Sequence, residues 1–356
     1  MKICPSALVW FVAAIGVAHY GCNSDKKDPA AWRDPSPHSV QFVTVDKNVQ
    51  LEVLDWGGSR RPLVLLAGLG NTAHIFDDFA PKLTAEYHVY GITRRGFGAS
   101  SAPENGYLGN RLGDDVLAVL DSLKIKRPVL VGHSIAGEEL NSAGSRYPER
   151  IAGLIYLDSV PSYDSSRGDF NVDLGELIEK LEQLQKLPAD DVPKWKHMVD
   201  DLLKESLPRF ERNLQALQKR LQTDLSTPPP AGPSDADLAS FPALRSWIAR
   251  IQGITMPEAE LRQTHEASTD GRVGKQRSLP SISRAIVAGK QRHSNIRVPT
   301  LAILAAVDNP DLEAQAKANG APIPHVVRLS HADHFVFLSN EEDVLREMKA
   351  FLGSLP

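Results

Sequence analysis

Ser134 stands in a segment that could expose a reactive hydroxyl. It follows the apolar run Pro128–Val131 and lies within Gly-His-Ser-Ile-Ala-Gly at positions 132–137. Small residues at Gly132 and Ala136 would let a strand and the next helix approach closely, and the tight turn between them would leave the serine side chain protruding. Such a nucleophile elbow lets a serine attack an acyl carbonyl. Ala136 replaces the last glycine of the full Gly-x-Ser-x-Gly pattern, so an ordinary strand-to-helix turn is the alternative.

A serine nucleophile needs an imidazole that accepts its proton and a carboxylate that orients this imidazole. His331 and His334 both follow the last apolar run of the chain, so either could be the base. Asp308 directly follows the apolar run 301–307, and we consider it first for the acid. Its rivals are Asp311, three residues later, and Asp158, which ends the apolar run 151–157.

Short apolar runs alternate with helical patterns through most of the chain, as expected of strand-helix units around a parallel sheet. Residues 40–45 and 49–54 alternate with a period of two and predict an opening antiparallel pair. The later apolar runs are nearly continuous, as in strands whose two faces are both covered; they are 62–67, 88–93, 128–131, 151–157, 298–306 and 326–329. These patterns predict an α/β fold with a mostly parallel central sheet flanked by helices.

Residues 161–297 show a different pattern. Leucines and other apolar residues recur there at helical spacing, around 174–184 and again around 203–221. The proline-rich stretch 226–234 interrupts this pattern because consecutive prolines cannot continue a helix. We therefore expect a helical cap at 161–297, with its leucine stripes packed in the core, inserted between two strands of a core formed by 39–160 and 298–356.

From Ser39 to Leu355 the chain resembles the alpha/beta-hydrolase superfamily. Besides the segment around Ser134, three stretches carry the resemblance. Residues 65–71 stand where the family has its oxyanion loop, although Ala67 replaces the usual histidine. Residues 93–100, Thr-Arg-Arg-Gly-Phe-Gly-Ala-Ser, match a loop that follows the fourth strand in the family, and residues 331–335 stand where the family keeps its catalytic histidine.

The resemblance implies a catalytic triad in the chain order serine, acid, histidine. It favours Asp308 as the acid, because that residue directly ends a strand, and His334 as the base, because an aromatic residue and an apolar helix start follow it. It also implies that the backbone N–H groups of Leu69 and Ile135 form the oxyanion hole. The expected site is therefore Ser134, Asp308 and His334 with these two donors.

Taken together, these features predict a serine hydrolase that forms an acyl-enzyme, most simply on a carboxylic ester of small size. The triad and the backbone donors imply no metal and no organic cofactor. The serine argues against the family's dehalogenases and epoxide hydrolases, whose nucleophile is an aspartate. Two alternatives remain open: a ligand-binding homologue without turnover, and a hydrolase of carbon-carbon, amide or thioester bonds.

The start of the chain predicts export. Residues 4–18 form an uncharged run that is short for a membrane span, and Gly21 and Cys22 follow it as in a lipoprotein processing site. We expect a lipoprotein-like signal peptide at 1–21 and a polar linker at 22–38, with the protein tethered to a membrane through Cys22 or released as a periplasmic or secreted protein. Cleavage after Ala18 and an uncleaved anchor are alternatives.

The charge balance argues against nucleic acid as a partner. Forty Lys and Arg residues oppose 44 Asp and Glu residues, which gives a formal net charge of −4, and no stretch carries a basic cluster.

Overall fold

The computed structural model describes residues 32–161, 170–224, 232–291, 293, 295–305, 316–317 and 321–356, the backbone alone at 170–173, 216–217 and 219–224. The expected signal peptide and most of the expected linker lie outside these residues. Within them, every helix is too short or too polar to cross a membrane.

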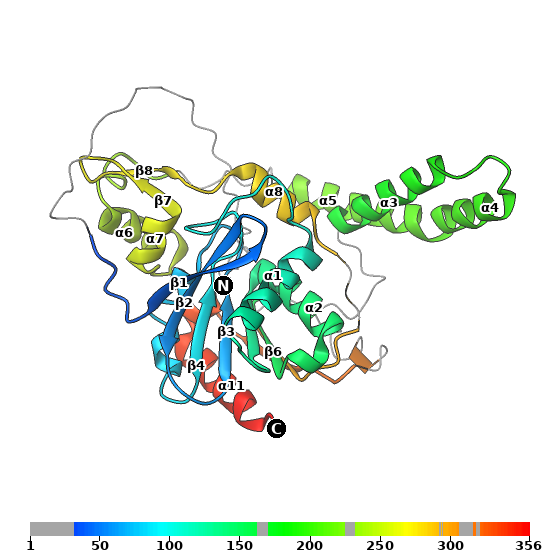
Figure 1. The fold of residues 1–356 in the computed structure, drawn as a ribbon. Coiled ribbons are helices and arrows are strands. Elements are labelled where there is room, and N and C mark those ends of the chain that lie inside the picture. Colours follow the sequence, from blue (N-terminus) through cyan, green and yellow to red (C-terminus); the bar gives the residue numbers. More distant parts are fainter. Residues whose placement is uncertain are drawn as a thin grey trace.

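An eight-stranded sheet forms the centre of the protein (Figure 1). Its strands are β1 (Ser39–Asp46), β2 (Val49–Gly57), β3 (Pro62–Leu66), β4 (His88–Ile92), β5 (Val129–His133), β6 (Gly153–Leu157), β9 (Thr300–Ala305) and β10 (His325–Leu329). They lie side by side in the order β1-β2-β4-β3-β5-β6-β9-β10. β2 pairs antiparallel with both β1 and β4, and the pairs from β4 to β10 are parallel. The predicted α/β fold with a mostly parallel sheet is confirmed.

Helices cover both faces of the sheet. This explains why the central strands are apolar at nearly every position. Successive residues of β3 point to opposite faces: Leu63 and Leu65 belong to one hydrophobic cluster, and Val64 and Leu66 to the other. Helices α1 (Gly109–Ser122) and α2 (Gly137–Arg146) cover the second face. The first face packs against α11 (Glu341–Ser354) and the short 3-10 helices η1 (Ala73–Phe76) and η2 (Ala80–Leu83).

The segment expected to form a cap lies between β6 and β9 in the chain. Its elements are α3 (Phe170–Gln185), α4 (Val192–Asp201), the π-helical turn η5 (Leu202–Ser206), α5 (Leu207–Asp224), α6 (Phe241–Gln252), α7 (Glu258–Thr264), β7 (His265–Ala267), β8 (Val273–Gln276) and α8 (Pro280–Ala288). Figure 1 shows α3, α4 and α5 as an arm that projects from the body, with α6, α7 and the β7–β8 pair on the other side of the molecule. This antiparallel pair was not predicted, because strands of three and four residues are too short to show a period.

The expectation that the leucine stripes pack in the core is wrong for much of the arm. Leu177 is buried, but Leu181, Leu203 and Leu207 are exposed by 41% or more of their surface. In the arm, α3 packs against α5, and α4 packs against the π-helical turn, yet these leucines keep much of their surface exposed. A helical period identifies an apolar stripe, but it does not show whether a second layer covers that stripe.

Candidate active site

Ser134 lies in a strained turn between β5 and α2. It begins the short helix η3 (Ser134–Ala136), and its φ angle is +55°, in the left-handed region that L-residues rarely adopt. The strand and the helix approach closely at Gly132, where a Cβ atom would lie 2.7 Å from Cδ1 of Leu140. Strain at one serine and a glycine at the close approach are the features of a nucleophile elbow.

A continuous hydrogen-bonded chain connects Ser134, His334 and Asp158. His334 follows β10, and its Nε2 lies 2.9 Å from Oγ of Ser134. Its Nδ1 lies 2.6 Å from Oδ2 of Asp158. With the imidazole oriented by the carboxylate, Nε2 is free to accept the hydroxyl proton.

Asp158 directly follows β6, and its carboxylate is fixed at both oxygens. Oδ1 accepts a hydrogen bond of 2.9 Å from the backbone N–H of Ala305, and Oδ2 faces the imidazole of His334. The backbone N–H of Asp158 donates to the carbonyl oxygen of Ile303 at 2.8 Å. Both of these backbone partners belong to β9, so the neighbouring strand holds the acid in place.

The carboxylate bonded to His334 is thus that of Asp158, the second of the rivals considered from the sequence, whereas the favoured Asp308 stays a prediction. Asp308 and Asp311 lie outside the described residues. β6 is the immediate neighbour of β5, which leads into Ser134, whereas β9 is one strand farther away. The carboxylate at the end of β6 therefore follows the strand next to β5, and it occupies Nδ1 of His334.

The two candidate bases have different places in the structure. His334 is partly buried and bonded to Ser134, whereas His331 is exposed in the loop after β10, with a φ angle of +65°. The geometry therefore brings His334 to the serine and leaves His331 at the surface.

His133 supports the segment that carries His334. Its Nε2 lies 2.9 Å from the backbone carbonyl oxygen of His334, so this nitrogen carries the proton and donates. Its ring also packs at 4.7 Å, between centroids, from the ring of His334. Burial, together with the neighbouring His334 and the charge of Arg94, lowers the pKa of His133 to about 3, although its backbone hydrogen bond acts in the opposite direction. His133 is therefore a neutral structural residue.

Leu69 and Ile135 lie together beside the elbow. Both side chains are partly buried and pack against one apolar cluster, formed by Phe97, Tyr107, Leu112, Ile282 and Ile286. Ile135 is the second residue of η3, and the first N–H groups of a helix lack partners within the helix. Ile282 and Ile286 belong to α8, so this helix packs directly beside the two residues expected to supply the oxyanion donors.

Arg94 holds the loop that contains Leu69, a role that the sequence did not reveal. Its guanidinium donates to the carbonyl oxygens of Ala67 and Gly68, at 2.9 Å and 3.3 Å, and its Nε pairs with buried Glu139 of α2. In a trans peptide the carbonyl and the following N–H point in opposite directions. Fixing the carbonyl of Gly68 therefore turns the N–H of Leu69 away from Arg94 and leaves it available to a ligand.

The sheet order, the elbow and the hydrogen-bonded side chains agree with a comparison to known families. The profile of the alpha/beta hydrolase fold family matches residues 61–341. The chain belongs to this family.

Individual relatives match only part of the chain. The 2-(acetamidomethylene)succinate hydrolase of Mesorhizobium japonicum is 25% identical over 112 residues, which cover 32% of this chain and 40% of that protein. Epoxide hydrolase A of Mycobacterium tuberculosis is 36% identical over 123 residues, or 33% of this chain and 38% of that protein. The matched stretches thus span well under half of these hydrolases.

Solved structures show the same fold over most of the chain. The crystal structure of E-2-(acetamidomethylene)succinate hydrolase superposes with a TM-score of 0.59 and 17% identity, and the match covers 89% of this chain and all of that one.

Proposed function

We propose that this alpha/beta-hydrolase family member is a serine hydrolase, with Ser134 as nucleophile, His334 as base and Asp158 as acid. One observation carries the proposal: the strained Ser134 lies 2.9 Å from Nε2 of His334, whose Nδ1 lies 2.6 Å from Asp158. The named relatives, which are hydrolases, support hydrolytic chemistry in general.

In the proposed first step, Oγ of Ser134 forms a bond to the acyl carbon while its proton passes to Nε2 of His334. The carbonyl oxygen takes up the electron pair and is stabilised by the N–H groups of Leu69 and Ile135. The tetrahedral intermediate then collapses, the bond to the leaving alcohol breaks, and His334 returns the proton to that alcohol. Asp158 stays ionised and stabilises the imidazolium.

The second step releases the acid. Water gives a proton to His334 and attacks the acyl-enzyme, and the carbon-oxygen bond to Ser134 breaks as the serine recovers its proton. The partly exposed apolar side chains of Leu69 and Ile135 beside the elbow support a substrate that is apolar next to the reacting carbonyl. A carboxylic ester is the substrate class that we propose.

Hydrolysis of p-nitrophenyl esters of increasing acyl length by the purified protein tests this assignment. Ser134→Ala should lower kcat by at least about 10⁴-fold, because the nucleophile itself is removed. His334→Ala should cost nearly as much, whereas His331→Ala, at an exposed position, should keep most of the activity. Near wild-type turnover in a folded Ser134→Ala variant, or a larger loss for His331→Ala than for His334→Ala, would contradict the proposal.

A further inference from the structure

A second group of chemically competent side chains lies outside the triad. Asp34 and His38 precede β1, and His74 and Asp77 lie in η1 and at its end. One ligand atom from each of these four residues lies within 4.8 Å of those from the other three. We refer to Asp34, His38, His74 and Asp77 as the 2His-2Asp cluster.

Four nitrogen-to-oxygen distances in the 2His-2Asp cluster are close to the ligand separations of a tetrahedral metal ion, with Asp77 facing His38 through Oδ1 and His74 through Oδ2. Nε2 of His38 lies 3.4 Å from Oδ2 of Asp34 and 3.3 Å from Oδ1 of Asp77. Nδ1 of His74 lies 3.1 Å from Oδ2 of Asp34 and 3.0 Å from Oδ2 of Asp77. Zinc bonds to nitrogen and carboxylate oxygen are about 2.0–2.2 Å long, which places neighbouring ligands of a tetrahedral ion about 3.3 Å apart.

Several of these polar atoms are buried without a hydrogen-bond partner among the described residues. Both ring nitrogens of His38 and Oδ1 of Asp77 are in this condition, and the side chains are only 3% and 2% exposed. Nε2 of His38 and Oδ1 of Asp77 are thus close together without a hydrogen bond between them. Buried polar atoms without partners are costly, and a cation between the two would satisfy both.

Further polar groups lie behind two of the ligands. Nε2 of His74, the nitrogen that points away from Asp77, lies 3.5 Å from Oε1 of buried Glu52. The backbone N–H of Ser36 donates to Oδ1 of Asp34 at 2.9 Å, which leaves Oδ2 for the cluster. A carboxylate behind a ligating histidine and a donor behind a ligating carboxylate are typical of metal sites.

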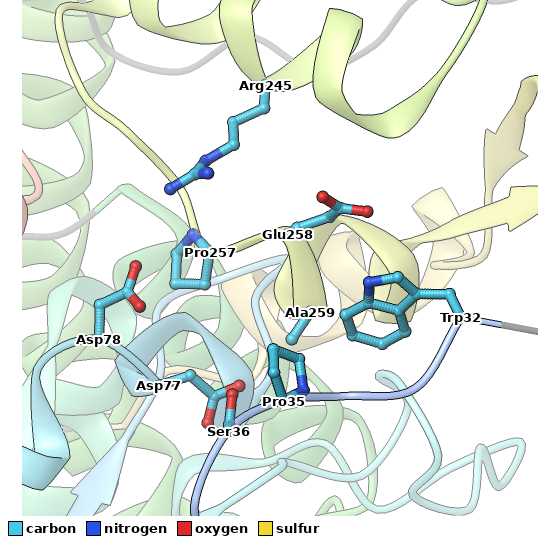
Figure 2. A pocket seen from close by; sticks show the side chains of 9 residues that line it. All are labelled: Trp32, Pro35, Ser36, Asp77, Asp78, Arg245, Pro257, Glu258 and Ala259. Atoms are coloured by element: carbon cyan, nitrogen blue, oxygen red, sulfur yellow. The ribbon is translucent and has the colours of Figure 1, made fainter.

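A small cavity of about 210 Å³ borders the 2His-2Asp cluster at Asp77. Trp32, Ser36, Arg245 and Glu258 also line it, and Figure 2 shows Asp77 and Ser36 close together.

We propose that the 2His-2Asp cluster is a structural site for a divalent transition metal, with zinc as the ion it fits best. Two imidazole nitrogens favour zinc over magnesium or calcium, which take oxygen ligands. Four protein ligands in a buried site leave no open position for substrate, as in structural zinc sites. The ion would fasten residues 34–38, at the start of the described chain, to η1, which directly follows the loop that contains Leu69.

Zinc content of the purified full-length protein, after incubation with Zn²⁺ and removal of excess metal, tests the site. We expect about one zinc per chain for the wild type. His38→Gln and Asp34→Asn should each lower the retained zinc at least about 10-fold, because each removes one of four ligands. His88→Gln is the matched control: His88 also pairs with a carboxylate, Asp55 at 2.9 Å, but lies outside the cluster, so its zinc content should stay at about one.

Two further measurements keep the test independent of variant folding. Co²⁺ bound to the wild type should show the intense visible absorption of tetrahedral coordination, and a chelator should lower the Tm of the wild type and of His88→Gln but not that of Asp34→Asn. A wild-type protein that retains no zinc and shows no such cobalt spectrum would overturn the proposal. Equal zinc content in the wild type, His38→Gln and Asp34→Asn would also overturn it, since the metal would then be bound elsewhere.

Discussion

The position of Asp158 explains how a partly exposed imidazole can stay oriented toward a serine. The side chain of His334 is 33% exposed and that of Asp158 is 17% exposed, so water could compete for Nδ1. The N–H of Ala305 fixes one carboxylate oxygen, which leaves the other directed at the imidazole. The correct tautomer of His334 therefore depends on a carboxylate that the sheet itself immobilises.

Asp158→Asn should lower kcat for ester hydrolysis by about 10³- to 10⁴-fold, because an amide in place of the carboxylate can favour the wrong imidazole tautomer and cannot stabilise the imidazolium. KM should change little, since Asp158 need not touch the substrate. Steady-state kinetics with a p-nitrophenyl ester measure both constants.

Asp308→Asn provides the comparison for that variant, because Asp308 is the acid that the chain order and strand ends favoured. We expect it to keep kcat within about 10-fold of the wild type. If Asp308→Asn were instead the more damaging of the two substitutions, the acid would be Asp308 and the bond between His334 and Asp158 would have no catalytic role.

The carboxyl edge of the sheet brings the site together from segments far apart in the sequence. β3 leads into the loop with Leu69, β5 into Ser134, β6 into Asp158 and β10 into the loop with His334. Because these strands are parallel, their carboxyl ends meet at one edge, where ligands bind in open α/β sheets. This edge was predictable, since apolar runs and small-residue turns mark where each strand ends.

The choice of the acid among the aspartates at that edge was not predictable from the sequence. Asp158 and Asp308 both directly follow apolar runs, and only the order of the strands shows which end lies beside β5. Arg94 was also hidden, because an arginine in a polar loop gives no sign that it will be buried against two carbonyl oxygens. The 2His-2Asp cluster combines two pairs separated by 36 positions, His38 to His74, so no local spacing indicates it.

Replacing Arg94 and Glu139 together by methionine tests whether the arginine positions the loop of Leu69. The double substitution removes a buried ion pair without leaving one charge alone, a change that buried cores often tolerate. We expect kcat to fall by about 10²-fold with KM nearly unchanged, the loss typical of one misplaced oxyanion donor. Stopped assays on the folded protein, checked by thermal unfolding, measure the effect.

A matched pair of substitutions, Arg95→Met with Asp115→Met, separates positioning from general loss of a buried ion pair. Arg95 and Asp115 are also buried and bonded, at 2.5 Å and 2.6 Å, but Arg95 does not contact the loop of Leu69 in the described structure. Equal losses of kcat in the two double variants would show that Arg94 has no specific effect on that loop.

Buried histidines couple the stability of the entire protein to acid. Burial lowers the pKa of His133 to about 3 and that of His293 to about 4, with the charge of Arg146 adding to the effect at His293. In the unfolded chain these imidazoles would take up protons near pH 6.5. Between these values each of these two imidazoles binds more protons in the unfolded state than in the folded state, so their contribution lowers the free energy of unfolding as the pH falls.

Chemical denaturation at several pH values between 7 and 4 should show this contribution. His133→Gln keeps an N–H donor for the carbonyl of His334 but cannot titrate, so its free energy of unfolding should fall less steeply with acid than that of the wild type. The difference in slope should approach about 1.4 kcal/mol per pH unit well below pH 6.5. Exposed His331→Gln should follow the wild type, and parallel curves for His133→Gln and the wild type would show that His133 is not held neutral.

Covalent labelling with a fluorophosphonate tests the central claim most directly, because such a probe reacts with an activated serine whatever the natural substrate. Intact mass and peptide mapping of the labelled full-length protein should show one adduct per chain, on Ser134. The folded Ser134→Ala and His334→Ala variants should show none. A folded wild-type protein that stays unlabelled, or an adduct on another residue that persists in Ser134→Ala, would contradict the assignment of Ser134 as the nucleophile.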